Sequence, residues 1–123
     1  MSSASFAQTD PVPWPSGHGD TIAVLALLPD ALSERYGLRF IEGSDNLDVY
    51  EAAAIRLESG RRLGLLRHRG APVPGTEIHA DGADNSLEAI REFLDGFGLA
   101  ADDLLWVRED VPLDHLRAAE HPA

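Results

Sequence analysis

The sequence predicts an α+β domain: a single mixed, mainly antiparallel sheet of about five strands with helices packed on it. Three observations support this fold class. The length of 123 residues suits one domain. The hydrophobic fraction of 44% and the charged fraction of 25% are ordinary globular values. Short apolar segments alternate with turn residues, and one longer segment has helical spacing.

The first segment of the chain favours irregular structure. Pro11, Pro13 and Pro15 alternate in residues 1–20, where they disfavour a helix and remove backbone donors. We therefore expect an irregular arm over 1–20, anchored by Phe6 and Trp14 or left as a disordered leader, and a single globular domain over 21–123. Residues 22–28 are apolar and short, which fits either a buried strand or the start of a helix.

The next segments contain the signals of a helix and a strand meander. Pro29 and Asp30 suit a first helical turn, and Gly37 suits a helix end, so we expect a helix over 29–36. A kinked helix over 20–36 is the alternative. Strands are then expected over 38–42, 47–57, 62–69 and 76–81, with a hairpin tip at Ser59-Gly60.

The last part of the chain predicts a βαβ unit. Asn85 is a candidate N-cap, with Glu88 as its capping-box partner. An apolar stripe at helical spacing follows, made of Leu87, Ile90, Phe93, Leu94 and Phe97. Gly96 or Gly98 ends this helix, and a short buried strand is expected over 104–107. That strand should run parallel to 76–81 through a right-handed crossover, and a last short helix is expected over 112–120.

A hairpin register can be written from the Ser59-Gly60 tip. It places Glu51 opposite His68, and a second register places His68 opposite Glu77. Four side chains would then share one face of the sheet: Glu51, His68, Glu77 and His79. They could bind a divalent metal ion, since the chain has no cysteine, or form an acid–base pair. The alternative is a solvated or salt-bridged surface.

Arginine is concentrated in the same hairpin. All ten basic residues of the chain are arginine, and five of them lie within 56–69. Arg67, His68 and Arg69 could hold an anion, because guanidinium groups bind carboxylate and phosphate in a bidentate manner. Internal pairing with the excess of acids is the alternative. The candidate binding residues are Arg67, His68, Arg69, Glu77 and His79.

Charge limits the functional classes. The net charge is −11, and the C-terminal half is the more acidic. A nucleic-acid partner would need a basic footprint, whereas a cationic protein partner is compatible. No phosphate-binding loop, dinucleotide fingerprint or nucleophile elbow occurs in the sequence. The absence of cysteine, of a signal peptide and of a membrane-length apolar run favours a cytoplasmic location.

These observations predict a small acidic bacterial protein-binding module without a cofactor. An immunity- or antitoxin-type inhibitor of a basic partner is its most concrete form. The alternative is a small metal-dependent or histidine-based enzyme that uses the cluster of Glu51, His68, Glu77 and His79. A homodimer, formed by pairing an exposed sheet edge or the apolar arm around Phe6 and Trp14, is a third possibility.

Overall fold

The computed structural model describes residues 6–9, 20–44, 49–71, 74–80, 85–109 and 111. Two α-helices and a 3₁₀ turn lie among seven strands in this part of the chain. In order, the elements are β1 (Phe6–Thr9), β2 (Asp20–Leu25), α1 (Pro29–Tyr36), β3 (Ile41–Ser44), β4 (Val49–Leu57), β5 (Arg62–His68), β6 (Thr76–Ala80), α2 (Ser86–Phe97), the 3₁₀ turn Ala101–Asp103 and β7 (Leu104–Val107).

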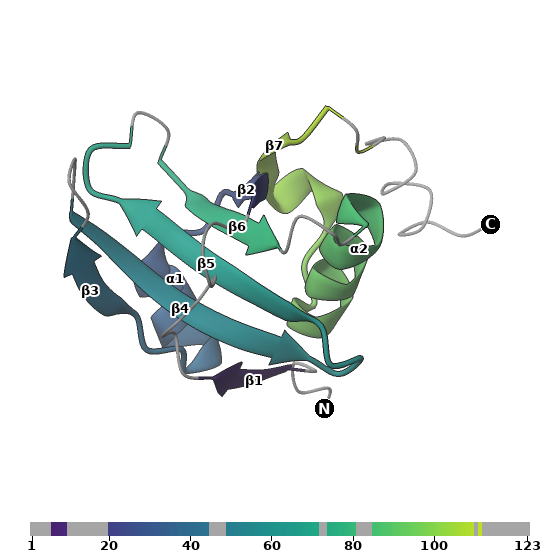
Figure 1. Ribbon diagram of the computed structural model, residues 1–123, viewed down its shortest axis with the longest axis horizontal. Helices are drawn as coiled ribbons and strands as arrows, with labels where there is room; N and C mark the ends of the chain where they lie inside the picture. The colour runs from purple at the N-terminus through teal and green to yellow at the C-terminus, as the bar shows by residue number, and fades with distance from the viewer. Residues whose placement is uncertain are drawn as a thin grey trace.

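All seven strands belong to one sheet with the order β1-β4-β5-β6-β2-β7, and β3 also pairs with β4 (Figure 1). Each pair of neighbouring strands is antiparallel. The structure therefore confirms an α+β fold with a mainly antiparallel sheet, but the expectation of a mixed sheet is wrong, because all the strand pairs of the described residues are antiparallel. The expected number of about five strands is wrong, because β1 and β2 add two more.

Strand β1 lies inside the segment expected to be an irregular arm. It pairs with residues 54–57 of β4, while β3 pairs with residues 49–52 along the same edge. Strand β4 is long enough, at nine residues, to serve both neighbours. The ring of Phe6 stacks on Phe97 with 4.2 Å between centroids, which anchors β1 to the core. Trp14 and the three alternating prolines lie outside the described residues.

The C-terminal βαβ unit is present in a split form. Strands β6 and β7 are both antiparallel to β2, so they run parallel to each other, and α2 connects them. They are not neighbours, because β2 lies between them. The segment 22–28 fitted either a strand or the start of a helix, and its first residues belong to strand β2. The expected helix over 112–120 lies outside the described residues.

Local signals determine both helices as expected. Pro29 begins α1, and Gly37 ends it in a left-handed conformation with φ of 73°. In α2, the Asn85 side chain accepts a hydrogen bond from the Glu88 N–H at 3.0 Å. Gly98 ends α2 with φ of 66°. None of the helices in the described part of the chain has the length and apolar character that a membrane crossing requires.

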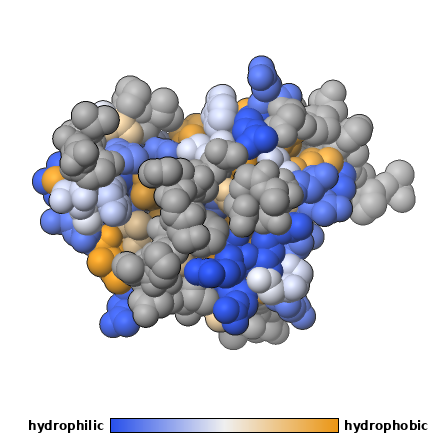
Figure 2. Space-filling model, in the orientation of Figure 1, coloured by the Kyte–Doolittle hydropathy of each residue, from blue (hydrophilic) through white to orange (hydrophobic). Residues whose placement is uncertain are grey.

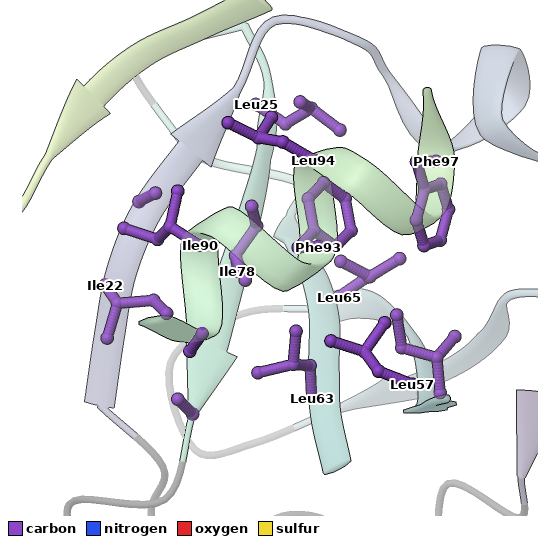
Figure 3. Close-up of a cluster of buried hydrophobic side chains, with 14 of the residues drawn as sticks. Ile22, Leu25, Leu57, Leu63, Leu65, Ile78, Ile90, Phe93, Leu94 and Phe97 are labelled. Carbon is purple, nitrogen blue, oxygen red and sulfur yellow. The ribbon is translucent and has the colours of Figure 1, made fainter. Parts of the chain in front are cut away.

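The hydrophobic core lies between the helices and one face of the sheet (Figure 3). Ile90, Phe93 and Phe97 of α2 point toward the sheet. They form one buried cluster with Leu65 and Ile78 of the sheet. Along β4 and β5, side chains alternate between this core and the opposite face of the sheet. The face of the sheet that lies away from the helices is called the open face below. Figure 2 shows the molecule in the orientation of Figure 1, with hydrophilic and hydrophobic residues interspersed on the surface.

Candidate functional site

A carboxylate lies between two imidazoles on the open face. Oxygen Oε1 of Glu77 is 3.0 Å from Nε2 of His79, and Oε2 is 3.6 Å from Nδ1 of His68. The Thr21 hydroxyl donates to Oε1 of Glu77 at 3.1 Å and lies 3.3 Å from Nε2 of His79. We call Thr21, His68, Glu77 and His79 the imidazole–carboxylate cluster. Three strands, β2, β5 and β6, supply its members.

The cluster is partly shielded from water. The side chains of His79, Glu77 and His68 are 15%, 26% and 33% exposed. The hydrogen bond with His79 lowers the pKa of Glu77 below its ordinary value of 4.5, against the opposing effect of burial. The charge of His79, the Thr21 hydroxyl and the charge of His68 lower this pKa further. Glu77 is therefore a carboxylate at neutral pH.

Glu51 does not belong to this cluster. The register places Tyr50 opposite His68 and sets Glu51 opposite Arg67, on the other face of the sheet. The expected hairpin register is wrong by one residue, because the turn has three residues rather than two. The Leu57 N–H donates to the Arg61 carbonyl, and Gly60 adopts φ of 95° within the turn. A shift of one residue moves alternate side chains to the opposite face.

The second expected register is also shifted, but by two residues. Glu77 faces Leu66 rather than His68, and His79 faces Gly64. An even shift preserves the alternation of faces, so His68, Glu77 and His79 still share the open face. The structure thus brings together three of the four expected residues. The rings of Tyr50 and His68 meet edge to face, at 5.8 Å between centroids, where Glu51 had been expected.

The geometry of the cluster defines its chemistry. The Thr21 hydroxyl donates a hydrogen bond to Glu77, and Nε2 of His79 lies close to both Thr21 and Glu77. A nucleophilic triad instead needs an acid on one ring nitrogen and the nucleophile on the other. Among the described residues, no group of three or more histidine, aspartate or glutamate side chains is arranged to hold a metal ion. Glu77 links β6 to β2 through the Thr21 hydroxyl and to β5 through His68.

The candidate anion ligands make contacts within the protein. Arg67 donates to the Gly75 carbonyl at 2.8 Å, from the face opposite to His68. Arg69 pairs with Glu42 at 3.1 Å, with both side chains well exposed. Alternation along β5 separates Arg67 from His68, so these neighbours in sequence do not form one cradle. The pair of Arg69 with Glu42 is the internal pairing with an acid that was the alternative, whereas Arg67 binds a backbone carbonyl.

Part of the C-terminal acidity is balanced in the same way. Arg61 lies 2.6 Å from Glu92 and 3.6 Å from Glu88, which ties the hairpin turn to α2. The Ser59 hydroxyl also donates to Glu92. Asp103 accepts a hydrogen bond from the Ala100 N–H at 2.8 Å. The acids at this end of the molecule include both ion-paired side chains of α2 and exposed residues such as Asp95, Asp102 and Glu109.

A second candidate surface surrounds strand β7. Leu105 and Trp106 are 50% and 48% exposed, so the expectation of a buried strand at 104–107 is wrong. This strand ends the path of the sheet, and within the described part of the chain it pairs with β2 alone. Asp102 and Glu109 flank it in sequence, and both are exposed. We call Val24, Asp102, Leu105, Trp106 and Glu109 the β7 surface.

Sequence reasoning missed this surface because Leu-Leu-Trp-Val is a continuous apolar run. Such a run fits a buried strand and an edge strand equally well. The acids on both sides of the run, with only Arg108 among them, were the available signal of a strand near water. The side chains of Leu104 and Val107 do pack partly against the core, so two of the four residues in this apolar run are partly buried.

The two candidate surfaces are joined through one residue. Val24 pairs with Trp106 on one side and with Glu77 on the other. Directly opposed residues of antiparallel strands point to the same face, so Trp106, Val24 and Glu77 form a row across three strands. The exposed indole therefore lies on the same face as the imidazole–carboxylate cluster.

Comparison with known proteins adds no family to this description. No protein-family model matches the sequence, no curated protein matches it, and no solved structure matches the chain.

Proposed function

We propose that this chain is a protein-binding module that docks a basic partner on the β7 surface. The observation that carries the proposal is the joint exposure of Leu105 and Trp106, at 50% and 48%, on the terminal strand of the sheet. Tryptophan is enriched among the residues that contribute most to protein interfaces. A large indole beside an exposed leucine is a suitable anchor for such a contact.

Charge supports a basic partner for this surface. The chain has a net charge of −11, and exposed Asp102 and Glu109 lie before and after the apolar pair. Apolar residues at the centre with charged residues at the rim are typical of protein interfaces. Opposite charge on the partner would speed association and favour the correct orientation. An immunity- or antitoxin-type inhibitor of a basic enzyme is a protein of this kind.

The test compares two apolar residues of similar exposure at opposite parts of the sheet. Wild-type protein, Trp106→Ala and Ile41→Ala are used as baits in extracts of the source cells at low ionic strength. Ile41 is 52% exposed on β3, so it is a matched control for Trp106. Thermal unfolding verifies that each variant is folded.

We expect wild-type protein and Ile41→Ala to retain a stoichiometric basic partner. Trp106→Ala should weaken its retention by about tenfold or more. Raising the ionic strength should weaken the wild-type complex as well. Equal retention by Trp106→Ala and wild type, or isolation of the monomer alone at low salt, would refute the proposal.

A further inference from the structure

The backbone of β7 has one edge without a strand neighbour in the described part of the chain. The strand order ends at β7, and the register pairs it only with β2. Two hydrogen bonds identify the edge that faces β2. The Arg108 N–H donates to the Ile22 carbonyl at 2.9 Å, and the Ala26 N–H donates to the Asp103 carbonyl at 2.7 Å.

Alternation along the strand then identifies the groups that point outward. The Arg108 N–H points toward β2, so alternation turns the backbone groups of Trp106 toward β2 and those of Val107 toward the outer edge. Leu105 has no partner in the register, because a bulge lies where Val24 and Leu25 pair with Trp106 and Leu104. Val107 thus offers hydrogen-bonding groups to an added strand.

The side chains beside this edge are apolar. The Leu105 side chain lies over Gly75 and Val24: a Cβ atom on Gly75 would be 3.2 Å from Leu105 Cδ1 and 2.9 Å from Val24 Cγ1. Trp106 stands beside Val24 on the open face. An added strand would therefore have apolar side chains next to it as well as backbone partners, the combination that strand addition uses.

We propose that the partner of the β7 surface contributes an extended, basic segment that adds to the outer edge of β7 as a further strand. This inference rests on the proposed function and specifies how the partner binds. Exposed Asp102 and Glu109 at the two ends of β7 favour lysine or arginine at the ends of the added strand. A second copy of this chain would bring another net charge of −11 to the contact, which opposes self-pairing.

The short strand and its bulge restrict where the segment can pair. Short, bulged edge strands discourage open-ended sheet growth. Pairing at Val107, next to the bulge at Leu105, gives a defined register, and the affinity then depends on the side chains of Leu105 and Trp106. The mode of binding therefore combines a few backbone hydrogen bonds with one aromatic anchor.

The test uses a peptide of alternating valine and lysine with blocked ends, titrated into the ¹⁵N-labelled full chain. Two versions are N-methylated, each on one alternate set of amides. In an added strand, only one set of amides faces β7, so methylation of that set should weaken binding by about tenfold or more. Methylation of the other set should leave binding unchanged. The amide proton of Val107 should exchange more slowly with solvent in the complex.

Matched controls separate the possible failures. A peptide of alternating valine and glutamate should not bind, and binding equal to that of the lysine peptide would overturn the basic partner. Equal binding of both N-methylated versions would overturn strand addition. The Trp106→Ala bait experiment separately tests whether a basic partner docks on the β7 surface. Sedimentation that shows a dimer dissociated by Trp106→Ala would assign the edge to a second copy instead.

Discussion

The Tyr36 hydroxyl donates a hydrogen bond to the backbone carbonyl of Phe97 at 2.7 Å. The two rings also meet edge to face, with 4.7 Å between centroids. This contact joins the last turn of α1 to the last turn of α2, and Phe6 of β1 stacks on the same Phe97 ring. The elements β1, α1 and α2, which are distant in sequence, thus all make contact at Phe97.

Removal of the Tyr36 hydroxyl should weaken this contact. Tyr36→Phe keeps the ring but leaves the Phe97 carbonyl without its donor, so the free energy of unfolding should fall by about 1 kcal/mol. Chemical denaturation measures the change. Tyr50→Phe is the control, since its ring packs against His68 on the open face. A Tyr36→Phe protein as stable as wild type would contradict the role of this bond.

The titration of Tyr36 gives a separate prediction. Burial raises the pKa of Tyr36 above its ordinary value of 10.0, so the neutral phenol is favoured in the folded state. Its contribution to stability is present below pH 10 and is lost as the pH rises toward the folded-state pKa. Ultraviolet absorbance should show a late tyrosine ionisation that Tyr36→Phe removes and Tyr50→Phe retains. Loss of the late ionisation in Tyr50→Phe would contradict the assignment.

Acid should act on the protein through Glu77. Because its pKa is lowered in the folded state, Glu77 contributes stability above pH 4.5 that is lost as the pH falls through the folded-state pKa. Glu77→Gln should therefore reduce stability at neutral pH by about 1–2 kcal/mol and flatten the decline in acid. Denaturation curves at several pH values measure both effects. Glu58→Gln, in the exposed hairpin turn, is the control for the loss of one carboxylate charge.

The N-cap of α2 can be tested with a conservative pair. Asn85→Ala removes the acceptor for the Glu88 N–H, which should cost about 1 kcal/mol of stability. Asn85→Ser keeps a capping oxygen and should restore most of it. Thermal unfolding compares the two variants. Equal melting temperatures for them would indicate that water replaces the cap.

Gly75 lies close to the neighbouring strand. A Cβ atom there would be 2.4 Å from the Leu25 carbonyl oxygen, so Gly75→Ala must displace backbone and should cost about 1–3 kcal/mol. Gly37→Ala has open space and only the strain of φ at 73°. NMR should show shifted amides for Leu25 and Leu105 in Gly75→Ala but not in Gly37→Ala. Unshifted signals in both variants would contradict the close approach.

The elements that the sequence predicts well are those with local signals. The caps of α1 and α2 and the stripe of α2 need only nearby residues, and they formed as expected. The face of the sheet on which Glu51 lies depends on the length of the hairpin turn. The turn has three residues and includes Gly60, whereas a two-residue tip was expected. A pattern of alternating side chains cannot correct such a slip, because it fits either face of the sheet in this alanine-rich strand.

The exposure of Trp106 and the pairing of β2 could not be predicted for a different reason. Both depend on which distant strand becomes a neighbour, and an apolar run carries no information on that choice. The grouping of His68, Glu77 and His79 was predicted only because the expected register between β5 and β6 was wrong by two residues. An even shift leaves each side chain on the same face of the sheet. The candidate cluster was therefore found in part, whereas the β7 surface emerged from the topology.

The place of β2 between β6 and β7 has a consequence for biosynthesis. Within the described residues, β2 finds its sheet partners only in Thr76–Ala80 and Leu104–Val107, which the ribosome makes long after Asp20–Leu25. The hairpin of β4 and β5 can form on the nascent chain, but β2 must wait with its apolar side chains unpaired. The sheet can therefore be completed only after the strand that bears Trp106 has been synthesised.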